Sequence, residues 1–300
     1  MRIVVTGREG QVARSLSELA PKRGHEIVTL SRPAFDLAGD IAPLIRAIEE
    51  QRPEIIVSAA AYTAVDRAER EPDLAFAVNE RGAAAVARAA RNLSVPVIHL
   101  STDYVFDGTK ATPYVEEDIA RPASVYGASK LAGEKAVRGE HNDSAILRTS
   151  WIYSPFGSNF VKTMLRLAED REEIRVVADQ LGTPTSALDI ADAILSVAAN
   201  LRGSTDADKR GIFHVAGSGE ASWAEFAERI FATTASLGHT SARVKPIITP
   251  DYPTEAKRPA NSRLNSDRLA RVHRLKLPDW RESLQQVIER LAGPTNSRDS

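Results

Sequence analysis

Cysteine is absent from this chain of 300 residues. Its absence excludes disulfides, thiolate nucleophiles and metal sites with cysteine ligands, and it is typical of proteins in a reducing cytosol. No apolar run approaches the roughly 18 residues that a membrane-spanning helix needs. Residues 1–5 also lack the charged and then apolar pattern of a targeting leader. We therefore expect a cytoplasmic protein with no membrane partner.

A strong charge of either sign is also missing. The formal net charge is −1, and acidic and basic residues are interspersed, so we expect no nucleic-acid partner. The six histidines show neither H-x-H nor H-E-x-x-H spacing, so we predict no catalytic metal. The chain has no G-x-S-x-G elbow and no Walker-type loop, which argues against a serine hydrolase or a P-loop enzyme.

Short runs rich in β-branched residues alternate with helical patterns through the first half of the chain. Several of the runs are apolar throughout, as expected for strands that are covered on both faces. The expected strands are 2–6, 26–30, 55–60, 95–101 and 145–149, and the expected helices are 11–22, 41–51, 73–92 and 124–138. This order predicts an α/β fold with a Rossmann-type, doubly wound parallel sheet.

Beyond residue 153 the alternation is less regular, which indicates a smaller C-terminal α/β domain. Four prolines fall between 246 and 259, where we expect an extended, ordered loop, and the polar residues 293–300 are expected to fray. The expected helices here are 159–170, 187–200, 222–237 and 278–291, and the expected strands are 174–177 and 211–216.

A glycine pattern follows the first expected strand directly. In T-G-R-E-G-Q-V-A, Gly7 permits a tight turn, Gly10 lets backbone approach a pyrophosphate, and the small Ala13 permits close packing of helix on strand. An ordinary turn is the alternative, but the strand before and the helix after favour dinucleotide binding. We predict an NAD(P)-binding domain at 1–153, with a returning segment near 187–216, and a mainly substrate-binding domain at 154–300.

The second expected strand ends without the acid that usually binds the ribose of NAD. Ser31 and Arg32 follow it, and an arginine there can accept a 2′-phosphate, so NADPH is favoured with NADH as the alternative. Asp36 can serve the adenine, and a surface role for Arg32 stays open. Small residues in S-A-A-A-Y-T-A-V-D, 58–66, leave room for cofactor across the next strand, or only for a buried strand.

Tyr126 and Lys130 are four residues apart, so on a helix their side chains project from one face. A phenol ordinarily ionises near pH ~10, but a neighbouring ammonium favours the phenolate and makes Tyr126 a candidate acid or base. Ser101 and Thr102 fall at the end of the fourth expected strand, where a hydroxyl can donate to a substrate carbonyl. An ordinary amphipathic helix and simple backbone capping are the alternatives.

Together these segments resemble the extended short-chain dehydrogenase/reductase family. The matching motifs are G-Q-V at 10–12, A-A-A-Y-T-A-V-D-R-A-E at 59–69, S-T-D-Y-V-F-D-G at 101–108, Y-G-A-S-K-L-A-G-E at 126–134, L-R-T-S-W-I-Y at 147–153, N-F-V-K-T-M-L-R-L-A at 159–168, D-Q-L-G-T-P-T at 179–185 and R-P-A-N-S-R-L-N at 258–265. The motifs after residue 147 are typical of one subfamily. The resemblance to it implies NAD(P)H-dependent reduction of the C4 ketone of dTDP-4-dehydro-L-rhamnose to dTDP-L-rhamnose.

The resemblance also implies roles for individual residues. Tyr126 would protonate the developing alkoxide, Lys130 would lower the pKa of Tyr126 and bind the nicotinamide ribose, and Thr102 would polarise the carbonyl. The expected cofactor contacts are Gly7, Gly10, Gln11, Val12, Ser31, Arg32, Asp36, Leu37, Ala61, Tyr62, Thr63, Ser101, Tyr126 and Lys130. The expected contacts of the nucleotide sugar are Thr102, Asp103, Tyr104, Tyr126, Trp151, Arg258 and Asn261.

Two other functions on the same scaffold stay open at this stage. An epimerase or dehydratase of nucleotide sugars would keep NAD tightly bound, and a regulatory subunit would be catalytically silent. The presence of Thr102, Tyr126 and Lys130 argues against the silent subunit, and Tyr104 after Asp103 argues against a dehydratase, which usually needs an acidic pair there. The sequence is compatible with a monomer or a homodimer.

Overall fold

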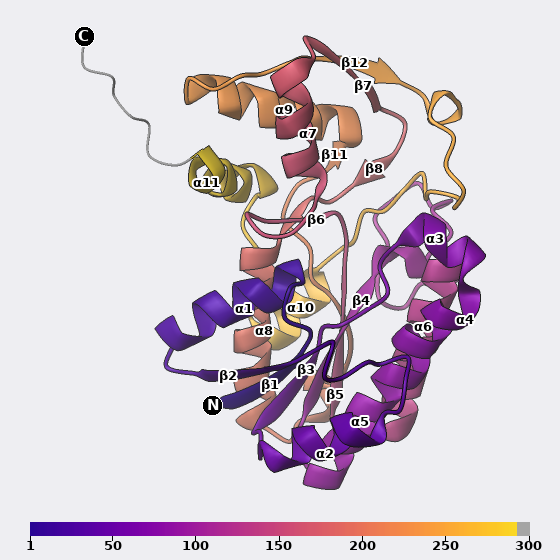
Figure 1. Cartoon of the computed structure of the whole chain (residues 1–300), viewed down its shortest axis with the longest axis vertical. Helices are drawn as coiled ribbons and strands as arrows, with labels where there is room; N and C mark the ends of the chain where they lie inside the picture. Colours follow the sequence, from indigo (N-terminus) through magenta and orange to yellow (C-terminus); the bar gives the residue numbers. More distant parts are fainter. Residues whose placement is uncertain (293–300) are drawn as a thin grey trace.

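A parallel sheet of six strands lies at the centre of the larger unit of the protein in the computed structural model, which describes residues 1–292 (Figure 1). The strands are β1 (Arg2–Thr6), β2 (Glu26–Leu30), β3 (Ile55–Ser58), β4 (Val97–Thr102), β5 (Ser144–Thr149) and β10 (Gly211–His214). Their order is β10-β5-β4-β3-β1-β2, and every neighbouring pair is parallel. The tail predicted to fray, 293–300, lies outside the described residues.

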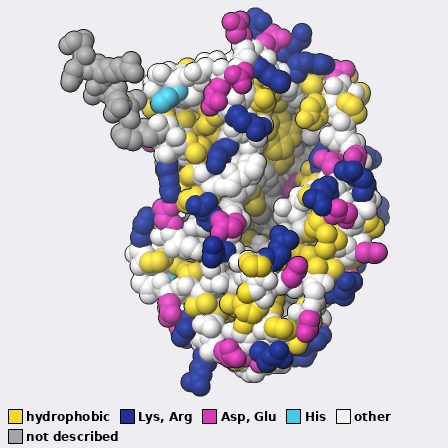
Figure 2. Space-filling model, in the orientation of Figure 1, with side chains coloured by type: hydrophobic (Ala, Val, Ile, Leu, Met, Phe, Trp, Pro, Cys, Tyr) yellow, Lys and Arg dark blue, Asp and Glu magenta, His cyan; other side chains and the backbone are white. Residues whose placement is uncertain are grey.

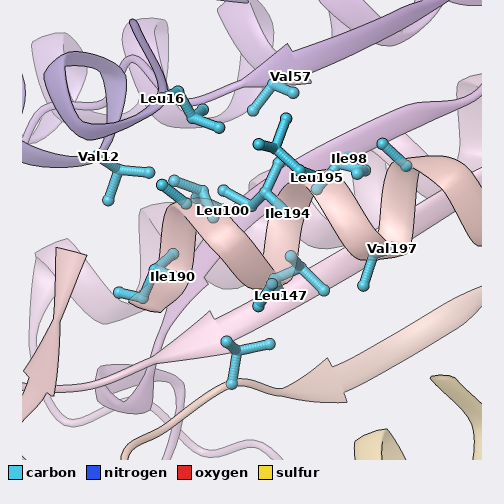
Figure 3. Packing of buried hydrophobic residues seen from close by; sticks show 14 of the residues in the cluster. Val12, Leu16, Val57, Ile98, Leu100, Leu147, Ile190, Ile194, Leu195 and Val197 are labelled. Atoms are coloured by element: carbon cyan, nitrogen blue, oxygen red, sulfur yellow. The ribbon is translucent and has the colours of Figure 1, made fainter. Parts of the chain in front are cut away.

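Helices cover both faces of this sheet, as the apolar strands require. On one face lie α1 (Gln11–Lys22) and α8 (Ala187–Arg202), and on the other α2 (Ala42–Glu50), α5 (Ala83–Leu93) and α6 (Val125–Glu140). Figure 3 shows Leu16 of α1 and Ile194 of α8 packed against sheet residues such as Val57 and Leu147. The predicted doubly wound, Rossmann-type fold is therefore confirmed.

The strand order creates a crevice at one edge of the sheet. The chain passes from β1 to β2 on one side and then to β3 on the other side of β1. In open α/β sheets ligands bind outside the carboxyl ends of the strands at such a switch point. Gly7, after β1, lies so close to Ala60, after β3, that a Cβ on Gly7 would meet the Ala60 Cβ at 3.4 Å.

A smaller α/β unit stands at the carboxyl edge of the sheet, at the top of Figure 1. Its core joins Tyr153, Phe226 and Trp280, all almost fully buried. The unit contains α7 (Phe160–Asp170), β7 (Glu173–Val177), α9 (Trp223–Ser236), β12 (Arg243–Ile247) and α11 (Trp280–Ala292), with the short strands β6 (Ile152–Tyr153), β8 (Leu181–Gly182), β9 (Thr185–Ser186) and β11 (Ala221–Ser222).

The structure differs from the sequence prediction at several elements. The helix predicted at 73–92 is interrupted by a π-helical segment, and two short helices were not predicted. The segments are α4 (Pro72–Phe76), the π-helical η1 (Ala77–Gly82), α3 (Val65–Arg70), α10 (Asp267–His273) and the 3-10 turns η2 (Asp103–Val105), η3 (Ala207–Lys209) and η4 (Thr249–Asp251). Among the described helices we find none with the length and apolarity that a membrane crossing requires.

Candidate active site

Helix α6 brings Tyr126 against the end of β4. The Ser124 hydroxyl caps the helix by accepting from the Gly127 N–H at 3.1 Å, which places Tyr126 in the first turn. A Cβ on Gly127 would lie 2.1 Å from the Tyr104 carbonyl oxygen, so only glycine lets the two backbones approach this closely. The Tyr126 and Tyr104 rings then meet edge to face, with centroids 5.5 Å apart.

Lys130 lies one turn further along α6, and its ammonium points at β4. Nζ donates to the Leu100 carbonyl oxygen at 2.6 Å and contacts His99 Nε2 at 3.3 Å. The side chain is buried, and burial lowers the pKa of Lys130 to about 8 although Glu134 acts in the opposite direction. The ammonium is therefore held by strand β4.

The pKa of Tyr126 corrects one sequence prediction. We expected Lys130 to lower it, but burial of the phenol raises the pKa of Tyr126 above its ordinary value of 10. The neighbouring Thr102 hydroxyl lowers it, Asp103 and Tyr104 raise it, and burial dominates. The spacing of the pair predicts a shared helix face, but it does not reveal that the ammonium turns to Leu100 and His99. Tyr126 therefore keeps its proton at neutral pH.

Thr102 and Asp103 form a buried pair beside the phenol. The Thr102 hydroxyl donates to Asp103 Oδ1 at 2.9 Å and accepts from the Tyr104 N–H at 3.2 Å. Burial raises the pKa of Asp103 to about 6, although the neighbouring Ser262 and Thr102 hydroxyls act to lower it. Asp103 Oδ2 has no hydrogen-bond partner among the described residues. The only hydrogen of the Thr102 hydroxyl is thus already given to a carboxyl group.

Behind Lys130 lies a buried ion pair that sequence reasoning did not find. Arg148 on β5 donates to the two oxygens of Glu134 at 2.8 and 2.7 Å. The Ser101 hydroxyl donates to Glu134 Oε1 at 2.5 Å, so its hydrogen points into the protein. Glu134 lies within the matched Y-G-A-S-K-L-A-G-E segment, but no spacing rule relates it to Arg148. In the predicted contact with the cofactor, the Ser101 hydroxyl can therefore act only as a hydrogen-bond acceptor.

The turn after β1 presents open backbone at the start of α1. Gly7 has a φ of +91°, which favours glycine, and a Cβ on Gly10 would meet nothing within 4 Å. Gly10 caps α1 without a side-chain hydrogen bond, so no side chain of the N-cap residue satisfies the first-turn N–H groups, such as those of Gln11 and Val12. The Gln11 side chain instead accepts from Ser154 at 2.8 Å and Asn159 at 3.0 Å, at the start of the smaller unit.

Residues 31–37 form the loop after β2. Arg32 is exposed and makes no ion pair in the described part of the chain, so its guanidinium is open to a ligand. Asp36 Oδ1 accepts from the Ala38 N–H at 2.9 Å, Ser31 is half-buried, and Leu37 is buried against Gly82. This loop therefore has one positive and one negative side chain at the expected adenosine end.

The loop after β3, 61–63, is fixed by a residue that the sequence did not single out. Asn79, in the π-helical segment η1, accepts from the Tyr62 N–H at 2.8 Å and donates to the Tyr62 carbonyl at 3.1 Å. It also donates to Ser129 of α6 at 2.9 Å. Ala61 is half-buried and Thr63 exposed. The π turn thus links the expected cofactor loop to the helix of Tyr126, as such turns often do at functional sites.

Trp151 begins the chain's passage into the smaller unit. It has a φ of +47°, a strained conformation for a bulky residue. Its ring stacks on Trp223 with centroids 3.5 Å apart and planes 10° from parallel. A Cβ on Gly182 would lie 2.2 Å from the Trp151 ring, so glycine makes room for it. The motif at 147–153 indicated Trp151, but no signal indicated Trp223.

The two residues predicted in the proline-rich loop behave differently. Arg258 reaches Asp66 of α3 at 2.5 Å, and this pair connects the loop to the other side of the site. Asn261 is buried and donates to the carbonyls of Lys110 (2.7 Å) and Thr112 (2.9 Å), while its oxygen accepts from Arg263. With all of these groups engaged, Asn261 holds a loop, and the structure does not favour the predicted contact with substrate.

Figure 2 shows that this face of the molecule is hollowed between the sheet unit below and the smaller unit above. Among residues 1–292 no group of three or more His, Asp or Glu side chains is arranged to hold a metal ion. The site therefore offers a buried phenol, a buried ammonium and open backbone N–H groups at the crevice. Such groups can bind an anion, bind a hydroxyl and donate a proton.

Comparisons with known proteins agree with this arrangement. Residues 1–292 match the family described as RmlD substrate binding domain. A dTDP-4-dehydrorhamnose reductase of Sinorhizobium fredii is 54% identical over 96% of this chain and 97% of its own length. One of Burkholderia thailandensis is 42% identical over 97% and 99%. The crystal structure of dTDP-4-dehydrorhamnose reductase from Bacillus anthracis in complex with NADP has a TM-score of 0.89 at 37% identity, covering 96% and 99%.

Proposed function

The chain belongs to the family of the RmlD substrate binding domain, and we propose that it is an NADPH-dependent reductase of the C4 ketone of dTDP-4-dehydro-L-rhamnose. The resemblance inferred from the motifs is confirmed at the level of the family. A single observation supports the assignment most: a protonated, buried Tyr126 lies one helical turn from a buried ammonium, beside the switch point of a dinucleotide fold.

The residues around the switch point fit a dinucleotide. Open N–H groups follow Gly10 at the start of α1, which suits a pyrophosphate, and the exposed Arg32 suits a 2′-phosphate. Ala61 to Thr63 would support the ring system from the β3 side. When bound, NADPH supplies the hydride that reduces the ketone.

Tyr126 would donate the proton that the new alcohol needs. Its raised pKa keeps the phenol protonated throughout the neutral range, so the acid form is present before the reaction. An alkoxide is a stronger base than a phenolate, so transfer from Tyr126 is downhill. General acid catalysis of this kind contributes roughly 10²- to 10⁴-fold in rate.

The groups around the phenol would bind and orient substrate. Lys130 would hold the ribose next to the nicotinamide through its remaining N–H, and Thr102 would point its hydroxyl at the C4 oxygen when Asp103 no longer takes its hydrogen. Trp151 would offer an apolar face to the deoxysugar. Arg258 would meet the diphosphate by leaving Asp66, whereas we no longer propose a substrate contact for Asn261.

One assay tests this function. NADPH and NADH are each mixed with the protein and dTDP-4-dehydro-L-rhamnose, and the loss of cofactor absorbance is followed. We expect oxidation with NADPH, slower oxidation with NADH, and none without the keto sugar. Protein that carries stoichiometric NAD and interconverts UDP-hexoses without consuming NADPH would contradict the proposal and identify an epimerase. Protein that binds neither cofactor would instead identify a silent relative.

A further inference from the structure

The Lys130 ammonium is held by two acceptors from one strand. An ammonium has three N–H donors. One donates to the Leu100 carbonyl at 2.6 Å, and the His99 Nε2 lies at 3.3 Å from the same nitrogen. His99 and Leu100 are neighbours on β4, and both their side chains are at least nine-tenths buried. Two of the three N–H groups are therefore taken by β4, and one is left for a ligand.

This contact assigns the tautomer of His99. An ammonium only donates, so His99 Nε2 must present its lone pair, and the ring hydrogen must sit on Nδ1. Nδ1 faces the Ser58 hydroxyl of β3 at 3.0 Å, where its hydrogen finds an acceptor. Burial and the neighbouring Lys130 hold the pKa of His99 well below its usual range, so the ring stays neutral. Ser58, His99 and Lys130 thus form one directed chain across two strands and a helix.

The surrounding helix is shaped for this approach. A Cβ on Gly133 would lie 2.1 Å from the Asn79 carbonyl oxygen and 3.6 Å from His99 Nε2. Glycine at this position is required by the Asn79 carbonyl, so that α6 packs against the backbone of η1 with His99 Nε2 at ordinary contact distance. Few residue types could replace His99, because one ring nitrogen must accept from Lys130 of α6 while the other donates to Ser58 of β3.

We propose that His99 is a positioning residue for the reaction: its neutral Nε2, oriented by Ser58, holds the Lys130 ammonium charged and directs its free N–H toward the cofactor. The inference rests on the proposed function, since it assigns Lys130 a ribose to bind. This positioning role differs from a packing role because it requires a hydrogen-bond acceptor at the place of His99 Nε2.

Other charged groups near Lys130 do not replace this acceptor. Glu134 on α6 favours the ammonium, but its oxygens are engaged by Arg148 of β5 and by Ser101 of β4. Tyr126, one turn back on α6, is neutral, and no ion pair joins Lys130 to Asp103 of η2 or to any other carboxylate within residues 1–292. His99 and Leu100 are therefore the acceptors that decide how firmly the ammonium is held.

Two substitutions of His99 separate the acceptor from the ring. His99→Gln places an amide oxygen near the position of Nε2, so it keeps an acceptor for Lys130. His99→Asn keeps a polar group near the position of Nδ1 and Ser58 but does not reach Lys130. The matched control is His214→Asn, which changes another buried histidine of the same sheet that has no contact with Lys130.

The measurement is NADPH affinity from pH 6 to 10, by cofactor fluorescence, with the melting temperature of each variant as a check of folding. Loss of one hydrogen bond to a charged group corresponds to about 1–2 pH units in the titration of Lys130. We expect wild-type affinity to weaken as the pH rises through about 8. In His99→Asn, NADPH affinity should begin to weaken at a pH about 1–2 units lower than in the wild type. The affinities of His99→Gln and His214→Asn should stay within about threefold of the wild type at each pH.

The inference would be overturned if folded His99→Asn showed the same dependence of NADPH affinity on pH as the wild type. It would also be overturned if this dependence shifted equally in His99→Asn and His99→Gln. If His99→Asn does not fold, Ser58→Ala is measured instead. This variant removes the hydroxyl that accepts from His99 Nδ1, so NADPH affinity should weaken at a lower pH than in the wild type, by a smaller shift than in His99→Asn. An unmoved profile in Ser58→Ala would then count against the inference. If wild-type protein binds no NADPH at any pH, the proposed function fails instead, which is a distinguishable result.

Discussion

The Thr102 hydroxyl donates to the Asp103 carboxyl across 2.9 Å, and both side chains are buried. A hydroxyl has one hydrogen, so a substrate carbonyl at this position must compete with Asp103 for it. Protonation of Asp103, whose pKa is raised to about 6, would weaken its hold on that hydrogen, because a neutral carboxyl group is a poorer acceptor than a carboxylate. If Thr102 polarises the substrate as proposed, the pair would couple that polarisation to the acid–base state of a buried carboxyl group.

Asp103→Asn should stabilise the folded protein at high pH. Because the folded pKa of about 6 lies above the ordinary 3.8, the folded state holds the proton more tightly, and stability is lost as pH rises from about 4 to about 6. The asparagine variant avoids this loss, which is on the order of 3 kcal/mol. Urea unfolding should show the variant to be more stable than wild type at pH 8 and similar below pH 4.

The exposed Asp208 supplies the control for this experiment, because Asp208→Asn removes a charge that is not buried. We expect no pH-dependent difference between that variant and wild type. The opposite result is a stability difference between Asp103→Asn and wild type that has the same size at pH 4 and pH 8. That result would contradict the claim that burying the ionised Asp103 carboxylate destabilises the folded protein.

Glu134→Gln should destabilise the protein strongly. It leaves the buried Arg148 guanidinium without its bidentate partner, and breaking a buried ion pair from one side costs about 3–5 kcal/mol. Glu134→Gln combined with Arg148→Met should recover most of this loss, since neither charge remains. Denaturant unfolding of the single and double variants measures both.

The matched control for Glu134 lies on the same helix. Glu140 pairs with Arg88 and Arg91 near the surface, where ion pairs contribute about 0–1 kcal/mol. Glu140→Gln should therefore change stability little. Equal losses in Glu134→Gln and Glu140→Gln would mean that burial does not determine the effect.

Gly127→Ala should impair both folding and turnover, whereas Gly139→Ala, on the same helix, should not. A Cβ at 127 would lie 2.1 Å from backbone oxygen, while one at 139 meets nothing within 4 Å. We expect about 1–3 kcal/mol of destabilisation and at least ~10-fold lower kcat for Gly127→Ala. Gly139→Ala should gain about 0.5–1 kcal/mol. Similar kcat values in the two variants would disprove the close contact of α6 with η2.

Trp223→Leu should raise the KM for the nucleotide sugar while leaving the KM for NADPH unchanged. Trp223 stacks on the Trp151 ring, and such aromatic pairs contribute about 0.5–1.5 kcal/mol, or roughly 2- to 10-fold. Trp280→Phe, in the core of the same unit, is the control and should lower only stability. An unchanged KM for the sugar in Trp223→Leu would separate this stack from substrate binding.

Local sequence patterns predicted the sheet and the first helix well, because there the local signals agree. Strands β1 and β2 and helix α1 have the predicted ends, since β-branched runs stop at turn residues such as Gly7. The π turn at Ala77–Gly82 was not predictable from local patterns. It is associated with a tertiary contact, because the Asn79 side chain binds the backbone of Tyr62, seventeen residues earlier. Helix α10 was missed because its seven residues are too few for a helical repeat of apolar residues to be recognised.

The candidate site was predictable in its members and not in its electrostatics. The spacing of Tyr126 and Lys130 is enough to place them on one helix. Burial raises the pKa of Tyr126, and the electrostatic effects of Asp103 and Tyr104, in a turn more than twenty residues earlier, act in the same direction. Likewise, the hydrogen bonds of Asn261 to residues 110 and 112 follow from tertiary contacts that no local pattern contains.

The proton-donor role of Tyr126 is tested most directly by Tyr126→Phe, with NADPH oxidation by dTDP-4-dehydro-L-rhamnose followed in a single turnover. Removing the donor should lower the rate at least ~10²-fold and leave NADPH affinity little changed. The control is Tyr153→Phe, which removes a buried hydroxyl that donates to the Trp280 carbonyl in the core of the smaller unit. This variant should react like wild type. A near-wild-type rate in Tyr126→Phe would contradict the account.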